Sequence, residues 1–325
     1  MTLRLFLPLA ALLSTLGCSL AWAQSSRDIP IVGFLATAPV SPTDPLVEVF
    51  RARLRELGYV DGQNVRIDFR SAQGQADRLP LLARELVDSK VKVIVVGTEP
   101  AVRAAKDATT VVPIVAISFD YDLVASGLVA SYNRPDANVT GINTRQPELL
   151  GKRLELLKEL LPGLSRLAVF WDGFGQRHLD EVKRGAHTLR IEVEPVQLGP
   201  PYDFNAAFKV TKQKRASAVL LVYSGAFYAE RSQIASHALA ARMPTMSWME
   251  LLTREGGLMS YGPDARESYR HIADFAARIL NGAKVSDLPV EQSTQFRLVV
   301  NLRTAKVLGI VIPESIMLRA DELIQ

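Results

Sequence analysis

From Ile29 onward the chain alternates short apolar runs with amphipathic helical periods, and this alternation limits the possible folds more than any other feature. The first helical period places Leu46, Phe50, Leu54 and Leu57 on one face and ends at Gly58. The apolar or alternating runs of this half read IPIVGFLAT, NVRIDFRSA, VKVIVVGT and VVPIVAIS. Strands buried on both faces read as such runs, and helices between them are typical of parallel sheets. The first half therefore predicts a parallel sheet covered by helices on both faces.

The same pattern restarts after a switch near Asn138–Thr144. A helical stripe of Leu150, Leu154, Leu157 and Leu161 opens the second half. Four further strand patterns follow, RLAVFWD, IEVEPVQL, SAVLLVYS and MPTMSWM. A long helix expected at Asp264–Leu280 follows GLMSYG and is expected to cross back to the first half. We therefore expect two α/β halves, residues 24–143 plus about 258–285 and residues 144–257 plus about 286–325. Without a low-complexity linker, short crossings should join them.

The first 23 residues have the pattern of a signal peptide. Arg4 precedes a long apolar run, and Ala21-Trp22-Ala23 forms the A-x-A cleavage pattern before Gln24. A membrane anchor and lipid attachment at Cys18 are alternatives that rank lower, the second because Thr15 stands where the lipidation motif usually has a leucine. The chain after this segment has no cysteine, which suits an oxidising compartment. The sequence thus predicts an exported protein.

Charge and motifs disfavour several function classes. Of the 38 Lys and Arg, one lies in the first 23 residues, and the rest are scattered among 34 Asp and Glu. Without a basic stripe, nucleic acid is not an expected partner. The four histidines, none of which forms an H-E-x-x-H motif, do not predict a zinc site. The sequence has no G-x-S-x-G, G-x-G-x-x-G or P-loop motif, so we expect no metal and no cofactor.

Polar and aromatic residues gather where the predicted strands end. Ligands of open α/β sheets bind outside the carboxyl ends of the strands. Thr98 precedes a helix, where its hydroxyl and backbone N–H groups could face a carboxylate, although it could also be a simple N-cap. The aromatic residues could form flat apolar walls or could pack between layers. The expected ligand contacts are Thr37, Thr98, Asp120, Tyr121, Trp171, Asp172, Tyr223, Ser224 and Trp248.

Two of these residues belong to Phe119–Asp122, which reads FDYD. Asp120 and Asp122 could be the acid/base pair of an exported enzyme. At a strand end, the spacing of Asp120 and Asp122 argues against both carboxylates reaching one substrate atom, unless a turn realigns them. Asp120 is better suited to pair with a ligand ammonium. Asp122 is expected to cap a helix that begins at Leu123. We therefore predict a binding protein rather than an enzyme.

Three stretches carry a resemblance to a known family. They are FRARLRELGYVDGQNVRIDFR (residues 50–70), DLVASGLVASYNRPDANVTGI (residues 122–142), and residues 255–324, which include LPVEQ and the segment NLRTAKVLGIVIP. The chain resembles the periplasmic substrate-binding proteins of ABC transporters, in the family that includes tryptophan- and tyrosine-binding members.

This resemblance implies a type I periplasmic-binding fold, in which two Rossmann-like lobes are joined by a hinge with three crossings. It also implies a periplasmic protein, expected to be a monomer, that binds a small molecule between its lobes. The ligand class implied is an amino acid or an aromatic or carboxylate compound. Closure around the ligand would present a surface to an ABC permease in the inner membrane.

The chain departs from the family pattern at cleft positions. It has FDYDLV where members commonly have a D-P-V turn, RPDAN where they have P-G-G-N, and WDGFG where they often have an Asn-Pro turn. These departures leave the ligand open. A sensory partner that presents its ligand to a receptor kinase is the alternative, because the same fold serves both roles.

Overall fold

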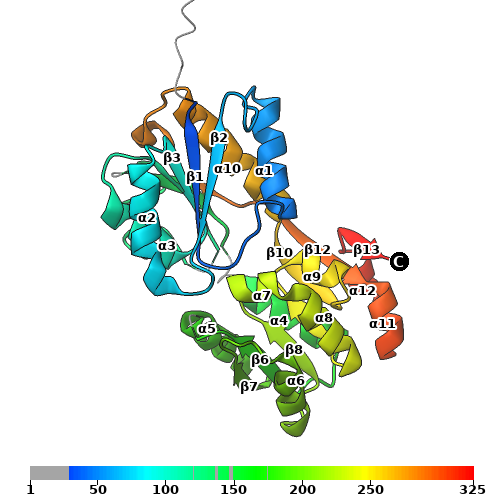
Figure 1. Cartoon of the computed structure of the whole chain (residues 1–325). Coiled ribbons are helices and arrows are strands. Elements are labelled where there is room, and N and C mark those ends of the chain that lie inside the picture. Colours follow the sequence, from blue (N-terminus) through cyan, green and yellow to red (C-terminus); the bar gives the residue numbers. More distant parts are fainter. Residues whose placement is uncertain (1–28, 120, 136–137, 146–148, 174) are drawn as a thin grey trace, which may run out of the picture.

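The computed structural model describes residues 29–119, 121–135, 138–145, 149–173 and 175–325. It contains two sheets flanked by helices, one above the other in Figure 1. The α/β fold class predicted from the sequence is confirmed. The predicted signal peptide, Cys18 and Asp120 lie outside the described residues.

The first lobe is built on a six-stranded parallel sheet with the order β11-β5-β4-β3-β1-β2. Two helices cover each face, because the apolar residues of the strands alternate between two core clusters. Helices α1 (Pro45–Glu56) and α10 (Ala265–Leu280) pack on one face, and α2 (Leu79–Asp88) and α3 (Glu99–Ala108) pack on the other. The strands are β1 (Ile31–Ala36), β2 (Arg66–Ser71), β3 (Val93–Val96), β4 (Ile114–Ser118), β5 (Val139–Asn143) and β11 (Glu291–Gln292).

The second lobe has a seven-stranded sheet with the order β13-β12-β10-β9-β8-β6-β7, parallel except for the β10–β12 pair. Its strands are β6 (Arg166–Trp171), β7 (Glu192–Gln197), β8 (Ala218–Leu221), β9 (Thr245–Ser247), β10 (Met259–Pro263), β12 (Phe296–Asn301) and β13 (Glu322–Ile324).

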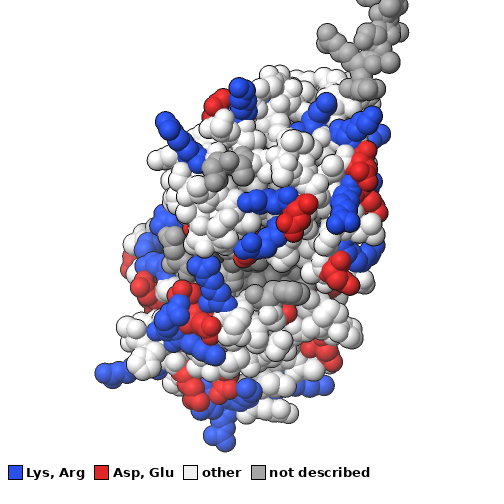
Figure 2. Space-filling model, turned by 90° about the vertical axis from the view of Figure 1, so that its left-hand side faces the viewer, with Lys and Arg blue, Asp and Glu red and all other residues white. Residues whose placement is uncertain are grey.

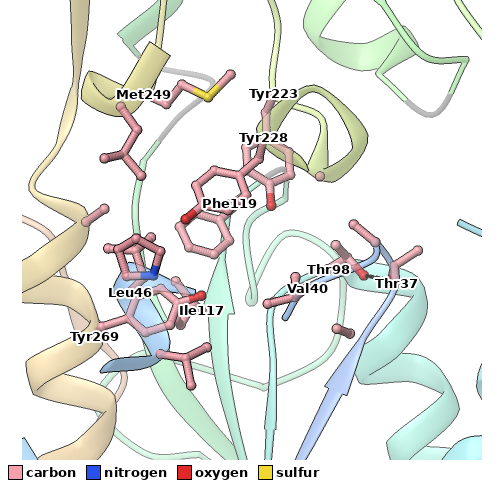
Figure 3. A pocket seen from close by; sticks show the side chains of 18 of the residues that line it. Thr37, Val40, Leu46, Thr98, Ile117, Phe119, Tyr223, Tyr228, Met249 and Tyr269 are labelled. Atoms are coloured by element: carbon pink, nitrogen blue, oxygen red, sulfur yellow. Dashed lines mark hydrogen bonds between the residues drawn. The ribbon is translucent and has the colours of Figure 1, made fainter. Parts of the chain in front are cut away.

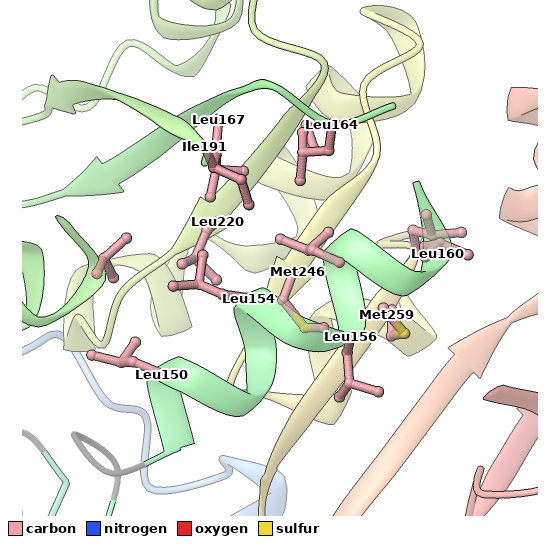
Figure 4. Close-up of a cluster of buried hydrophobic side chains, with 14 of the residues drawn as sticks. Leu150, Leu154, Leu156, Leu160, Leu164, Leu167, Ile191, Leu220, Met246 and Met259 are labelled. Carbon is pink, nitrogen blue, oxygen red and sulfur yellow. The ribbon is translucent and has the colours of Figure 1, made fainter. Parts of the chain in front are cut away.

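Leucines dominate one face of this second sheet. Helices α4 (Leu149–Leu160) and α5 (Gln176–Thr188) bury their apolar stripes there, together with residues of α11 (Leu302–Leu308) and α12 (Glu314–Met317). Figure 4 shows Leu150, Leu154 and Leu160 of α4 among side chains of the strands. The other face packs against α6 (Phe204–Gln213), α7 (Gly225–Ala229), α8 (Arg231–Ala240) and α9 (Glu250–Arg254).

Among the described elements, consecutive strands change sheet three times, after β5, after β10 and after β11. The chain leaves the second sheet after Pro263 and returns to it after Gln292, each several residues later than the boundaries near 258 and 286 expected from the sequence. The reason is that the apolar segment Met259–Pro263 is a strand of the second sheet, not the start of the crossing. Helix α10 crosses back to the first lobe as expected, since Ile272 and Phe275 lie in its core.

The surface is mixed in charge. Basic and acidic side chains are interspersed over both lobes on the face shown in Figure 2. In the part of the chain that the structure describes, no helix is both long and apolar enough to cross a membrane.

A histidine at the third crossing should make stability depend on pH. His271 of α10 contacts Glu291 of β11 through Nδ1 (2.7 Å) and Glu267 through Nε2 (2.9 Å). Burial lowers the pKa of His271, but the bonds to Glu291 and Glu267 outweigh it, so the pKa is raised above 6.5. This contribution to the free energy of unfolding is fully present below the unfolded-state pKa and is lost as pH rises through the folded-state pKa.

The difference in unfolding free energy between wild type and His271→Gln should therefore be larger at pH 5.5 than at pH 8.5, measured by urea denaturation. Comparing the two proteins cancels the opposite effect of His178, whose pKa burial lowers to about 4. A difference that does not change with pH would contradict the prediction.

Candidate ligand-binding site

A cavity of about 480 Å³ lies between the lobes, at the carboxyl ends of their strands. This volume is within the range of small-molecule sites. The first lobe contributes the ends of β1, β3 and β4 with parts of α1 and α10, and the second contributes segments after β8 and β9. Figure 3 shows the side chains that line it, among them Thr37, Val40, Leu46, Thr98, Ile117, Phe119, Tyr223, Tyr228, Met249 and Tyr269.

Aromatic rings from both lobes meet in this cavity. Phe119 follows β4 and Tyr223 follows β8, so each occupies a strand end of its own lobe. Their rings are stacked, with centroids 5.3 Å apart and planes 10° from parallel. The Tyr223 ring also packs against Trp248, at 5.1 Å and 53°. Such a wall suits a flat apolar ligand, because offset stacking adds to the free energy of burial.

A pair of hydroxyl groups forms the polar part of the wall. Thr37 Oγ1 and Thr98 Oγ1 are 2.6 Å apart. Thr98 is the N-cap residue of α3, as the alternative interpretation had it, but its side chain makes no capping hydrogen bond and its hydroxyl bonds to Thr37 instead. Only one of two bonded hydroxyls can donate to the other, and the second retains a proton for another acceptor. The pair can therefore donate to a ligand oxygen in the cavity.

A smaller chamber of about 60 Å³ lies beside the first and shares Thr37, Thr98 and Tyr223 with it. Asp172, which follows β6, is the charged side chain among the described residues that line it. Burial, and then the charge of Asp172, raise the pKa of the nearby Tyr202. The chamber has room for a small head group such as an ammonium, which a carboxylate would favour.

Charged side chains line one end of the large cavity. Glu250 and Arg254 come from α9, Arg266 from the start of α10 and Arg297 from β12. Arg297 donates to Glu250 (2.8 Å), and both Arg254 (2.7 Å) and Arg297 (3.0 Å) donate to Glu322. Most of this charge is thus paired within the second lobe.

Most residues expected at the site do lie at these two cavities. Thr37, Thr98, Tyr223 and Trp248 line the large one, and Asp172 and Ser224 line the small one. The Ser224 hydroxyl also caps α7, accepting from the backbone N–H of Ala226 (3.1 Å) and Phe227 (3.2 Å). Ligand contact by these residues stays a prediction.

Two expected residues lie elsewhere. Trp171 shares a face of β6 with Leu167 and Val169, so the period of two carries its ring toward the leucine-rich core and away from the cleft. Tyr121 is 1% exposed and packs in the first-lobe core with Leu123 and Leu128. Neither is retained as a candidate contact.

The carboxylate of Asp122 is held by hydrogen bonds within the first lobe. Its Oδ1 accepts from the backbone N–H of Val124 (2.9 Å) and Ala125 (2.7 Å), so it caps a turn rather than the helix that was expected. Its Oδ2 accepts from Asn143 Nδ2 (2.7 Å) and from the Tyr132 hydroxyl. Burial raises the pKa of Asp122, but these donors outweigh it and lower the pKa overall. A carboxylate held ionised by four donors is poorly suited to shuttle protons.

Sequence reasoning missed several lining residues. Phe119 stands inside FDYD and could have been found from its place at a strand end. Tyr228 and Tyr269 lie on helices α7 and α10, and Met249 lies next to α9. Their approach to the cavity depends on how the lobes pack together, for which the sequence carries no local signal.

Comparisons with known proteins agree with this architecture. A sequence model described as ABC transporter substrate binding protein matches residues 42–324. A curated tyrosine-binding protein of Clostridioides difficile is 27% identical over 263 residues, which cover 80% of this chain and 75% of that protein.

Two solved structures superpose on most of the chain. A conserved domain protein from Vibrio cholerae has a TM-score of 0.79 and 25% identity, and a Streptococcus pneumoniae ABC domain in complex with L-Trp has a TM-score of 0.80 and 23% identity. Each match covers 91% of this chain and 99% of the other. The expected type I periplasmic-binding fold is thereby confirmed.

Proposed function

The chain belongs to the ABC transporter substrate-binding protein family, and from this premise we propose that it is a periplasmic receptor for a small aromatic solute, which it delivers to a membrane permease. The observation that carries the proposal is the interlobe cavity whose wall is formed by Phe119, Tyr223 and Trp248. Rings contributed by both lobes can hold a planar ligand only when the lobes are closed, so such a ligand would further stabilise the closed form.

Aromatic amino acids are the leading ligand class. The relatives that bind tyrosine and L-Trp support this choice, and so do the two cavities. The aromatic side chain would occupy the apolar chamber, and the ammonium would face Asp172 in the small one. The hydroxyl pair of Thr37 and Thr98 would donate to the carboxylate.

Export to the periplasm and cleavage before Gln24 belong to the same proposal. The A-x-A pattern at residues 21–23 supports it. The intact mass of the exported protein distinguishes cleavage before Gln24 from lipid attachment at Cys18.

Aromatic amino acids should stabilise the purified protein against unfolding. A ligand present at one hundred times its Kd adds about 2.7 kcal/mol to the free energy of unfolding. We expect Trp, Tyr or Phe to raise the melting temperature, and Leu at the same concentration to have little effect. The measurement is a thermal-shift series followed by calorimetry of the best ligand.

A matched variant separates specific binding from general stabilisation. Tyr223→Ala removes the ring that contacts both Phe119 and Trp248, so it should weaken binding at least tenfold. If instead a carbohydrate raises the melting temperature and aromatic compounds do not, the proposed ligand class is wrong.

A further inference from the structure

We propose that Asp44 and Tyr228 form a latch between the two lobes, which holds them closed and sets how long a bound solute is retained. The latch rests on the proposed function, in that it gives a closing receptor a direct lobe-to-lobe bond. The Tyr228 hydroxyl, on the second lobe, lies 2.8 Å from Asp44 Oδ1 and 3.0 Å from Asp44 Oδ2, on the first lobe. One phenol donor therefore lies within reach of both oxygens of one carboxylate.

The carboxylate is held rigidly in the first lobe. Asp44 is the N-cap of α1, and its Oδ1 also accepts from the backbone N–H of Leu46 (2.9 Å). Helix α1 is anchored by Phe50 and Leu54, which are fully buried in the first-lobe core. The acceptor therefore moves only when the whole lobe moves.

The phenol is held just as firmly in the second lobe. Tyr228 lies on α7, where its neighbour Phe227 is fully buried in the second-lobe core. Arg231 lies over the Tyr228 ring at 4.9 Å and donates to the Tyr228 backbone oxygen (2.9 Å). Burial and the charge of Asp44 raise the pKa of Tyr228 far above its usual range, so the phenol remains a donor at any physiological pH.

The bond lies beside the solute cavity and next to a close approach of the two lobes. Tyr228 lines the cavity, as Figure 3 shows. In the same short helix, Gly225 faces Ala38 of the first lobe so closely that a Cβ there would lie 3.0 Å from the Ala38 Cβ. Because both ends of the bond belong to rigid lobes, opening the cleft must break it. A hydrogen bond to a charged group, lost on opening, slows the release of a solute.

Three variants test the latch. Tyr228→Phe keeps the ring in the cavity wall and removes only the hydroxyl. Asp44→Ser keeps a side chain that caps helices well but is too short to reach Tyr228. Tyr59→Phe is the matched control, since the Tyr59 hydroxyl bonds to Asn281 (2.9 Å) within the first lobe.

The first measurement is small-angle X-ray scattering of the exported protein without ligand. We expect Tyr228→Phe and Asp44→Ser to have a larger radius of gyration than wild type, and Tyr59→Phe to match wild type. The second measurement is stopped-flow release of the tightest-binding aromatic amino acid. Release should be about tenfold faster from Tyr228→Phe, with an association rate and a melting temperature close to those of wild type.

The two measurements distinguish a failure of the latch from a failure of the proposed function. If no aromatic amino acid binds wild type, the proposed ligand class is wrong. The scattering of the ligand-free variants still decides whether the latch exists. If Tyr228→Phe and Asp44→Ser scatter as wild type does, the latch is wrong. It is equally wrong if Tyr59→Phe opens the protein as much as Tyr228→Phe does, because the effect would then be one of general stability.

Discussion

Replacing Gly225 by valine should prevent full closure of the lobes and weaken solute binding by about ten- to a hundredfold. A Cβ at position 225 would lie 3.0 Å from the Ala38 Cβ across the cleft, and valine adds two further methyl groups. Forcing such groups into a packed contact costs about 1–3 kcal/mol, which is about one to two decades of affinity. Calorimetric titration with the best ligand measures the loss, and X-ray scattering should show a larger radius of gyration.

Two further variants show whether the contact itself is responsible. Gly163→Val is the matched control, because a Cβ at Gly163, also in the second lobe, meets no atom within 4 Å. It should bind as wild type does. Ala38→Gly in the Gly225→Val background should recover part of the affinity, since it removes the opposing methyl group. If Gly225→Val binds as tightly as wild type, the closed arrangement is not the one that binds solute.

The parallel sheets could be predicted because strands buried on both faces have a distinctive composition. The runs VKVIVVGT and VVPIVAIS contain β3 and β4, all of whose residues are buried. The later hinge crossings were harder to predict. Strand β11 has two residues, too few for any periodic signal, and the segment of β10 contains Gly262 and Pro263, which usually mark a turn.

The site was predictable where it depends on topology and unpredictable where it depends on side-chain direction. Thr37 and Thr98 lie at the cavity because the carboxyl ends of β1 and β3 are adjacent in the sheet. Trp171 also stands at a strand end, but one residue of register decides which face it occupies. Tyr269 lies on α10, whose place at the cavity depends on how the chain crosses between lobes.

The glycine at position 141 is where the fold itself should be most sensitive to a single methyl group. We expect Gly141→Ala to lower the free energy of unfolding by at least about 3 kcal/mol, the range of the most damaging single substitutions. Gly141 has φ +143°, a conformation that residues with a side chain rarely adopt. A Cβ there would lie 1.9 Å from the Ala116 carbonyl oxygen.

No side-chain movement can relieve this clash, because the Ala116 atoms involved are backbone atoms of β4, in the middle of the sheet. It pairs with Val96 of β3 on one side and with Gly141 itself on the other. Moving β5 away would also disturb the hinge, since β5 pairs with β11 and the Asn143 carbonyl accepts from the Ser293 backbone N–H (2.9 Å) at the third crossing. Gly141→Ala should therefore lose stability and solute affinity together.

The control is a glycine-to-alanine change of opposite expected sign. Gly151 lies within α4, and a Cβ there meets no atom within 4 Å, so Gly151→Ala should raise stability by about 0.5–1 kcal/mol. Urea denaturation of both variants, with calorimetry of solute binding, makes the comparison. If Gly141→Ala were as stable as wild type, β4 and β5 could not pair in the register that leads the chain into its first crossing between the lobes.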